Sequence, residues 1–301
     1  MNYAEKLRLA EQLRNTSVVE PRVLASHEAY LDAVDVEPAS IPTREGAARA
    51  NLIIPRRIPA PQSLFVNVHG GGFVRPHARR DTVFCAVVAV RVGCKVLDLD
   101  YSLAPEHPFP AAFNEAYDVL KWAYTRGETI GVDRDRIAMG GHSAGGNLTA
   151  GVALMANRTG DFALRLQMLD YPFLDGVTDP ADKALGGDLI PVDRMRAFIE
   201  LYVEDPRDLA NPCISPVMAE AASLAGLPPA LVLTAGKDSL RAEADRYVAM
   251  LIAAGVEVTA KRFLASDHGF VVNCLDEYGE AMDLICDSLA WALRGKAKEG
   301  A

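Results

Sequence analysis

A serine in a glycine-rich turn is the residue of this sequence best placed to do chemistry. Ser143 lies in the segment GGHSAGGN at 140–147, after a short strand-like stretch at 136–139 and before a run rich in alanine and leucine. These flanks predict a buried strand followed by a helix, with the serine at the reversal between them. Such a turn brings backbone segments very close, so only small residues fit at Gly141 and Gly145. The pattern predicts that Ser143 is a nucleophile exposed at a strand tip.

A serine hydroxyl is a poor nucleophile until a base takes its proton, and that base is usually a histidine held by a carboxylate. His142 is adjacent to Ser143, but adjacent side chains diverge on such a turn. His69 opens a glycine-rich loop, which we expect it to shape through hydrogen bonds. Three further histidines lie before the serine, outside the expected chain order: His27, His77 and His107. His268 is therefore the predicted base.

Asp238 and His268 follow two successive predicted strands, at 230–234 and 256–263. Considered alone, Asp238 is equally consistent with a cap of the helix that follows it, and His268 with a surface-loop histidine. Neighbouring strand tips would nevertheless present both side chains together, and serine, acid, histidine is a known chain order for catalytic triads. The ordered set predicts a triad of Ser143, Asp238 and His268.

Attack on a carbonyl group creates a negatively charged oxygen, which needs N–H donors placed in advance. The three glycines at 70–72 come shortly after the apolar run 64–68, where they would leave backbone N–H groups unobstructed. Three glycines are also consistent with a flexible turn or a phosphate cradle. The phosphate cradle fails on spacing, because the GxxxxG that begins at Gly140 has Gly146 and Asn147 where a P-loop needs lysine and serine or threonine.

The rest of the chain must supply strands that end beside these residues. Apolar runs predict strands at 47–54, 64–68, 95–99, 136–139, 164–169, 230–234 and 256–263. Helices are predicted between them, among others at 80–92, 144–155, 240–254 and 276–294. This alternation predicts an α/β fold with a mostly parallel, doubly wound sheet of about eight strands.

Two segments fall outside this alternation. Residues 1–45 have the pattern of one or two amphipathic helices, a predicted N-terminal arm. Residues 173–229 show a helix at 192–203 and no evident buried strand, which is more chain than a crossover needs. We expect both segments to form a cap over the strand tips, with 46–172 and 230–301 as the catalytic domain.

Length and composition limit the class of protein. The 301 residues, 50% of them hydrophobic and 24% charged, suffice for one large α/β domain or two smaller ones. The formal net charge of −9 argues against nucleic acid or an anionic membrane as a partner. Charged residues interrupt the first 20 positions, so they lack the apolar core of a signal peptide, and no segment approaches the roughly 18 apolar residues of a membrane span.

Cysteine and histidine spacing bears on redox state and metals. The five cysteines are scattered and never form a CxxC pair, which predicts reduced thiols in a cytoplasmic protein. HExxH and paired Cys/His spacings are absent, so we expect no metal and no cofactor.

Together these motifs resemble those of the hormone-sensitive-lipase-like family of α/β-hydrolase esterases, from about residue 47 onward. The matching segments are HGGGF at 69–73, the loop 100–111, the turn 141–146, Asp238 with Leu240, and HGF at 268–270. The resemblance implies an α/β-hydrolase fold with a helical cap. It implies Ser143 as nucleophile, His268 as general base and acid, and Asp238 as the carboxylate that orients it. It also implies an oxyanion hole formed by the N–H groups of Gly71, Gly72 and Ala144.

Two positions depart from the family pattern. The family often has aspartate before the nucleophile, where this chain has His142, and proline after the catalytic aspartate, where it has Ser239. Neither change removes a catalytic group, so they concern the subfamily and the substrate more than activity.

The implied function is that of a cytoplasmic serine carboxylesterase that acts on small-molecule, short-chain acyl esters through an acyl-enzyme. The same residues are compatible with an amide or an acetylated sugar as substrate. The fold also permits a non-catalytic binding protein, although no triad member is missing. We expect Tyr101 and Phe173 to contact the substrate. Members of the family often form homodimers, but no exposed apolar stripe in this sequence indicates one.

Overall fold

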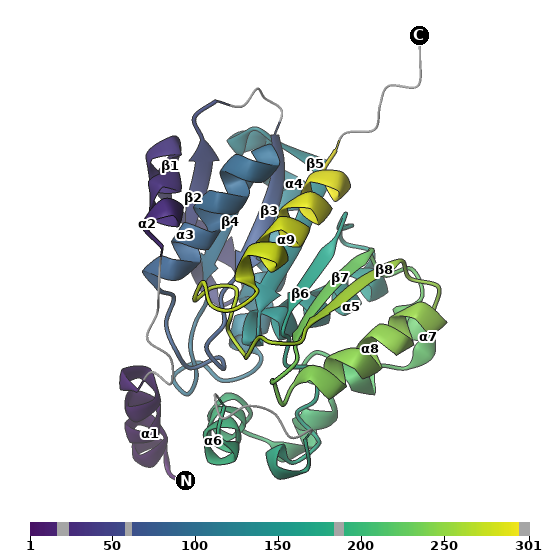
Figure 1. The fold of residues 1–301 in the computed structure, drawn as a ribbon. Coiled ribbons are helices and arrows are strands. Elements are labelled where there is room, and N and C mark those ends of the chain that lie inside the picture. The colour runs from purple at the N-terminus through teal and green to yellow at the C-terminus, as the bar shows by residue number, and fades with distance from the viewer. Residues whose placement is uncertain (17–23, 58–61, 184–189, 295–301) are drawn as a thin grey trace.

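The structure, a computed structural model, describes residues 1–16, 24–57, 62–183 and 190–294. Its strands form one sheet of eight strands in the order β1-β2-β4-β3-β5-β6-β7-β8 (Figure 1). The strands are β1 (Val34–Thr43), β2 (Gly46–Pro55), β3 (Gln62–Val68), β4 (Lys95–Asp100), β5 (Val132–His142), β6 (Gln167–Asp170), β7 (Ala230–Ala235) and β8 (Val258–Phe263). From β4 to β8 all neighbours are parallel, while β2 is antiparallel to β1 and to β4. The expected mostly parallel sheet is confirmed.

Helices cover both faces of the sheet, as parallel strands require. Helices α3 (Arg79–Val88) and α9 (Tyr278–Ala292) pack on one face, and α4 (Ala111–Arg126), α5 (Ala144–Thr159) and α8 (Arg241–Ala253) pack on the other (Figure 1). The central strand β3 is therefore buried along its whole length. Among the helices in the described ranges, none combines the length and the apolar character needed to cross a membrane.

The N-terminal region differs from the helices expected through residue 45. Helices α1 (Tyr3–Asn15) and α2 (Ala25–Glu28) are followed by β1, which pairs with β2 along its whole length. Pro38 and Pro42 weaken the strand signal in the sequence. An edge strand forms hydrogen bonds to a neighbouring strand along only one side. It therefore tolerates proline, which lacks a backbone N–H donor. The last part of the predicted arm is thus an edge strand of the sheet.

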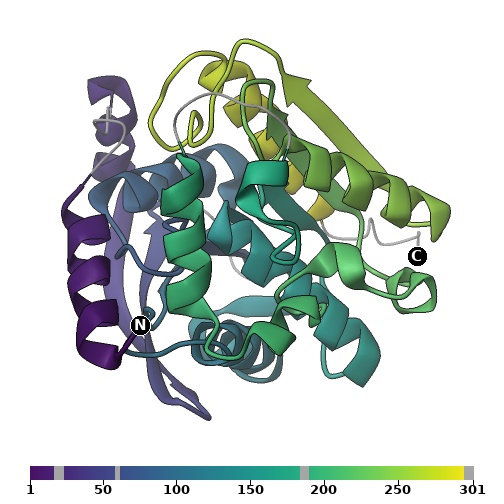
Figure 2. The same ribbon diagram turned by 90° about the horizontal axis from the view of Figure 1, so that it is seen from below.

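Two helices lie at the end of the sheet where the parallel strands terminate. Seen from below, α6 (Val192–Tyr202) crosses this end, and α1 lies beside it (Figure 2). Arg194 on α6 connects the two helices, because it donates hydrogen bonds to the carbonyl oxygens of Leu13 (3.3 Å) and Thr16 (2.7 Å). Between β6 and β7 the described residues form α6, the short helix α7 (Ala221–Leu224) and 3-10 turns, but no strand.

Candidate active site

Ser143 lies on a strained turn between β5 and α5. Its backbone angles are φ 55° and ψ −113°, a conformation that residues other than glycine rarely adopt. A β-carbon on Gly145 would lie 2.0 Å from the carbonyl oxygen of Val68, and one on Gly141 would lie 2.5 Å from the carbonyl carbon of Gly145. These contacts leave no room for larger residues, as the sequence pattern predicted.

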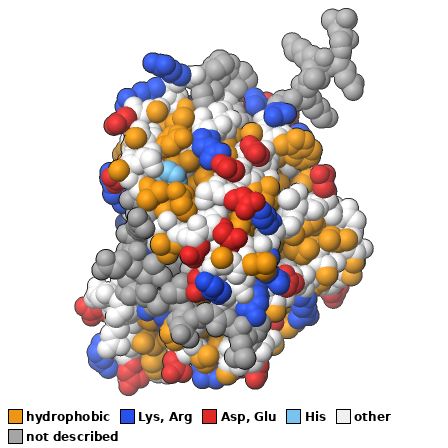
Figure 3. Space-filling view, viewed as in Figure 1, with side chains coloured by type: hydrophobic (Ala, Val, Ile, Leu, Met, Phe, Trp, Pro, Cys, Tyr) orange, Lys and Arg blue, Asp and Glu red, His pale blue; other side chains and the backbone are white. Residues whose placement is uncertain are grey.

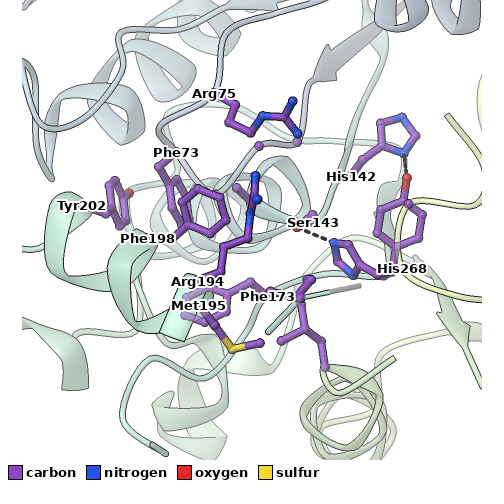
Figure 4. A pocket seen from close by; sticks show the side chains of 18 of the residues that line it. Phe73, Arg75, His142, Ser143, Phe173, Arg194, Met195, Phe198, Tyr202 and His268 are labelled. Atoms are coloured by element: carbon purple, nitrogen blue, oxygen red, sulfur yellow. Dashed lines mark hydrogen bonds between the residues drawn. The ribbon is translucent and has the colours of Figure 1, made fainter. Parts of the chain in front are cut away.

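The three side chains predicted to form a triad are hydrogen-bonded in series. His268 Nε2 lies 3.0 Å from Ser143 Oγ (Figure 4), and His268 Nδ1 lies 2.7 Å from Asp238 Oδ2. Asp238 is 2% exposed, and its other carboxylate oxygen accepts a hydrogen bond from the N–H of Leu240. Asp238 thus stabilises the turn before α8 and holds the histidine, but it is not the helix cap that the sequence also allowed, because the N-cap of α8 is Leu240 and has no side-chain hydrogen bond.

The loops that carry Asp238 and His268 are held together by their backbones. The N–H of Gly236 donates to the carbonyl oxygen of Phe263 (2.7 Å), and the N–H of Lys237 donates to that of Ser266 (3.1 Å). These bonds continue the parallel pairing of β7 and β8 past the strand ends. Side chains 30 positions apart are therefore placed within hydrogen-bonding distance of each other.

The surroundings of His268 raise its pKa above the ordinary value of 6.5. Burial is the largest influence and lowers the pKa, because a buried imidazolium loses hydration. The charge and the hydrogen bond of the Asp238 carboxylate, together with the charges of Asp170 and Asp267, raise the pKa and outweigh burial. The same charges stabilise the imidazolium that forms when Ser143 loses its proton.

The glycine loop after β3 lies against the serine turn. A β-carbon on Gly70 would lie 3.0 Å from the carbonyl oxygen of His142 and 3.5 Å from the β-carbon of Ser143. Gly71 and Gly72 have φ angles of 124° and 59°. Within the described residues, no hydrogen bond uses the N–H groups of Gly71, Gly72 or Ala144. These donors remain available to an oxygen atom beside Ser143.

His69 and Tyr101 support this loop from beneath. The Nδ1–H of His69 donates to the carbonyl oxygen of Gly70 (2.7 Å), as expected for a histidine that shapes the loop. Tyr101 stacks on the His69 ring at 4.2 Å and donates its hydroxyl to the His69 carbonyl oxygen. Tyr101 is fully buried and does not line the pocket. The expectation that Tyr101 contacts the substrate was wrong, because its side chain points into the core.

His142 has a partner other than the serine. Its Nδ1 lies 2.7 Å from Asp170 Oδ2 at the end of β6, and both side chains are buried. Burial raises the pKa of Asp170, and the hydrogen bond and charge of His142 oppose this effect. His142 therefore pairs behind the turn, which agrees with its rejection as the base. The sequence did not indicate that Asp170 would be its partner.

A pocket of about 140 Å³ opens beside Ser143 and His268. Phe173 lies in its wall, where the sequence predicted a substrate contact, together with residues that were not predicted. Helix α6 contributes Arg194, Met195 and Phe198, and the glycine loop contributes Phe73 and Arg75 (Figure 4). These three α6 residues are at positions i, i+1 and i+4 of the helix predicted at 192–203, and such spacing places them on one helix face. The sequence did not show that this face meets the pocket.

No group of three or more histidine, cysteine, aspartate or glutamate side chains in the described residues is arranged to hold a metal ion. The chemistry available at this site is that of the hydrogen-bonded triad and the adjacent N–H donors. This arrangement suits nucleophilic attack on a carbonyl carbon.

Comparison with known proteins identifies the class to which this fold and site belong. The family model described as alpha/beta hydrolase fold matches residues 65–272, most of the chain. The chain belongs to the α/β-hydrolase family and, within it, to the hormone-sensitive-lipase-like esterases.

Several named esterases are similar to this chain. Esterase LipI of Mycobacterium tuberculosis is 36% identical over 223 residues, 72% of this chain and 68% of that protein. The arylesterase of Saccharolobus solfataricus is 31% identical over 226 residues, 72% of this chain and 73% of that protein. The solved structure of the Pyrobaculum calidifontis esterase has a TM-score of 0.83 and 34% identity, covering 98% of this chain and 94% of that one.

Proposed function

We propose that the protein hydrolyses esters of short carboxylic acids through an acyl-enzyme formed on Ser143. The observation that carries the proposal is the continuous hydrogen-bond chain from Ser143 through His268 to Asp238, beside a loop with available N–H groups. The relatives named above are esterases, which supports ester hydrolysis as the reaction class.

In the proposed reaction, Ser143 Oγ attacks the ester carbonyl carbon while His268 Nε2 accepts the hydroxyl proton. The negative oxygen that develops receives hydrogen bonds from the N–H groups of Gly71, Gly72 and Ala144, and each such donor is worth about 100-fold in rate. His268 then protonates the departing alcohol. A water molecule, deprotonated by His268, attacks the acyl-enzyme and releases the acid.

The size of the pocket favours a small ester. A volume of about 140 Å³ is small for a ligand pocket, since such pockets commonly measure about 300 to 1,000 Å³. Its walls include five phenylalanine and tyrosine rings, those of Phe73, Tyr171, Phe173, Phe198 and Tyr202. These apolar walls suit short alkyl or aryl groups on either side of the ester bond.

We also propose that α1 and the described residues between 173 and 229, which are 173–183 and 190–229, form a cap, and that the sheet with its remaining helices forms the catalytic part. Two contacts support this division. Phe198 on α6 lies against the glycine loop, where a β-carbon on Gly72 would lie 2.5 Å from its ring. Arg194 connects α6 to α1 through two backbone carbonyl groups. Because β1 pairs in the sheet, the catalytic part begins at Val34.

The test is the Ser143→Ala variant, assayed with 4-nitrophenyl acetate and with a fluorophosphonate probe. Removal of the nucleophile should lower kcat by about 1,000-fold or more and abolish labelling. Thermal unfolding should show an intact fold. Ser223→Ala is the control, because Ser223 is an exposed residue of α7 away from the pocket.

Three outcomes would contradict the proposal. Turnover or labelling that survives in Ser143→Ala would place the nucleophile elsewhere. Faster hydrolysis of matched anilides or acetylated sugars than of simple esters would assign a different substrate. An unlabelled wild-type protein without turnover would indicate a binding protein on this scaffold.

A further inference from the structure

Three arginines line the pocket of Ser143, against a single carboxylate. Arg75, Arg80 and Arg194 reach its wall, and Asp81 is the one acidic residue among the described lining residues. On the surface shown in Figure 3, acidic and basic side chains are interspersed. The pocket therefore has an excess of positive charge that this surface does not show.

Arg75 is the least compensated of the three. It follows the glycine loop, where its N–H donates to the carbonyl oxygen of Gly71 (2.9 Å). Arg75 as a residue is half-buried, its guanidinium has no hydrogen bond or ion pair within the described residues, and its Nε is buried without a partner. Burial lowers the pKa of Arg75, and the nearby charges of Arg80 and Arg194 lower it further. A partly buried cation without a partner costs stability, so an anion that entered the pocket would relieve this cost.

The other two arginines use neutral acceptors. Arg194 donates to the carbonyl oxygens of Leu13 and Thr16, and Arg80 donates to the side-chain oxygen of Asn273 (3.0 Å). Neither forms an ion pair with an acidic residue of the described ranges, and the Nε of Arg80 is also buried without a partner. These bonds hold the guanidinium groups in place without neutralising them.

Asp81 offsets only part of this charge. Its carboxylate accepts a hydrogen bond from the N–H of Ala78 (2.8 Å), at the start of α3. It attracts Arg75 through charge but forms no hydrogen bond with any of the three arginines. Among the described residues that line the pocket, three guanidinium groups therefore face one carboxylate, while Asp238 and Asp170 are paired with His268 and His142 and do not line it.

The geometry points to a substrate that carries a carboxylate in addition to its ester bond. In Figure 4, Arg194 extends from α6 towards Arg75, on the same side of Ser143. The Arg75 guanidinium, with a planar set of free N–H donors, suits a bidentate bond to a carboxylate, and Arg194 and Arg80 add attraction. This inference rests on the proposed function, since it assigns the substrate class of the same site. Arg75 is its specificity-determining residue.

The first experiment compares substrates of equal shape and different charge in a pH-stat assay. Monoethyl succinate is paired with ethyl 4-methylpentanoate, and acetoxyacetate is paired with isobutyl acetate. The first pair places the carboxylate on the acyl side and the second on the alcohol side. In at least one pair, kcat/KM of the anionic ester should exceed that of its neutral partner about tenfold or more.

The second experiment measures the same ratio in Arg75→Gln. Loss of a charge-assisted bidentate contact should lower the ratio of anionic to neutral kcat/KM by about 10- to 100-fold, and Arg75→Lys should restore part of it. Arg196→Gln is the matched control, because Arg196 lies on the outer side of α6, is paired with Asp179 and does not line this pocket. The control removes the same charge from the protein and should leave the ratio unchanged.

The outcomes separate this inference from the proposed function. If neutral esters are hydrolysed by Ser143 but neither anionic ester is preferred, or if Arg75→Gln leaves the ratio unchanged, the inference is overturned and the esterase proposal stands. If no ester is hydrolysed, calorimetry of monoethyl succinate and acetoxyacetate with Ser143→Ala gives an independent measurement. The dissociation constant of at least one anionic ester should then be about tenfold or more higher for the double variant Ser143→Ala/Arg75→Gln than for Ser143→Ala. Unchanged dissociation constants for both anionic esters would overturn the inference.

Discussion

The Asp238→Asn substitution tests whether the triad works as its geometry indicates. The asparagine oxygen can still accept the hydrogen bond from the N–H of Leu240, which Asp238 Oδ1 accepts at 3.0 Å. The side-chain NH₂ group then faces His268 Nδ1, 2.7 Å from the present position of Oδ2. Because NH₂ can only donate, Nδ1 must give up its proton. The remaining ring proton is then on Nε2, where it faces Ser143.

This tautomer cannot accept the serine proton, and the imidazolium loses its stabilising carboxylate. We expect kcat to fall roughly 1,000- to 10,000-fold, as loss of the equivalent carboxylate does in serine proteases. That decrease corresponds to about 4 to 5 kcal/mol of transition-state stabilisation. The free energy of unfolding should change much less, because asparagine has the shape of aspartate and keeps the hydrogen bond from the N–H of Leu240.

The pH profile gives a second measurement of the same change. His268 must be neutral to act as base, so activity is present above its pKa and is lost below it. In the wild type, kcat/KM should decrease as pH falls through a value above 6.5, because Asp238 raises the pKa of His268. Without the Asp238 charge, less opposes the effect of burial, so the pKa of His268 should fall. The residual activity of the variant should therefore extend to lower pH.

The assay is a pH-rate profile on a short ester, with Asp267→Asn as control. Asp267 accepts the backbone N–H of His268 and contributes least of the named carboxylates to its raised pKa. Its substitution should leave kcat near that of the wild type. If Asp238→Asn keeps kcat within about tenfold of the wild type and its acid limb does not move, Asp238 does not hold the base and the mechanism is refuted.

Two further substitutions test the turn and the residue beside the nucleophile. Gly145→Ala places a β-carbon 2.0 Å from the Val68 carbonyl oxygen, so the free energy of unfolding should fall by about 1–3 kcal/mol or more, whereas Gly279→Ala, with open space around it, should change it by less than about 1 kcal/mol in urea unfolding. Equal stability of the two variants would contradict the packing argument. His142→Gln weakens the buried contact with Asp170 and should cost roughly 1–3 kcal/mol of stability, yet keep kcat within about tenfold of the wild type. Loss of turnover as large as in Ser143→Ala would show that His142 takes part in catalysis.

The residues of the triad could be predicted from the sequence because their placement is a local property. Ser143 lies between a strand and a helix, and Asp238 and His268 each follow a strand. In a parallel sheet the carboxyl ends of the strands lie at one edge, so residues after successive strands meet there whatever the details of packing. The glycines beside Ser143 were equally predictable, because only they fit a turn this close to Val68.

The edge strand β1 could not be predicted, because its stability comes from pairing with β2. Residues 34–43 contain two prolines and few of the apolar residues that mark a strand. Their backbone hydrogen bonds to β2 supply the structure that local propensity does not.

By itself, the sequence determined the fold class and the identity of the three side chains in series, since both follow from strand order and residue type. Only the tertiary structure decided what surrounds them. It buried Tyr101 beneath the glycine loop, paired His142 with Asp170, and brought Arg75 and Arg194 together in one pocket from positions far apart in the chain. Burial and charge compensation depend on neighbours that are distant in sequence, so no local pattern could show them.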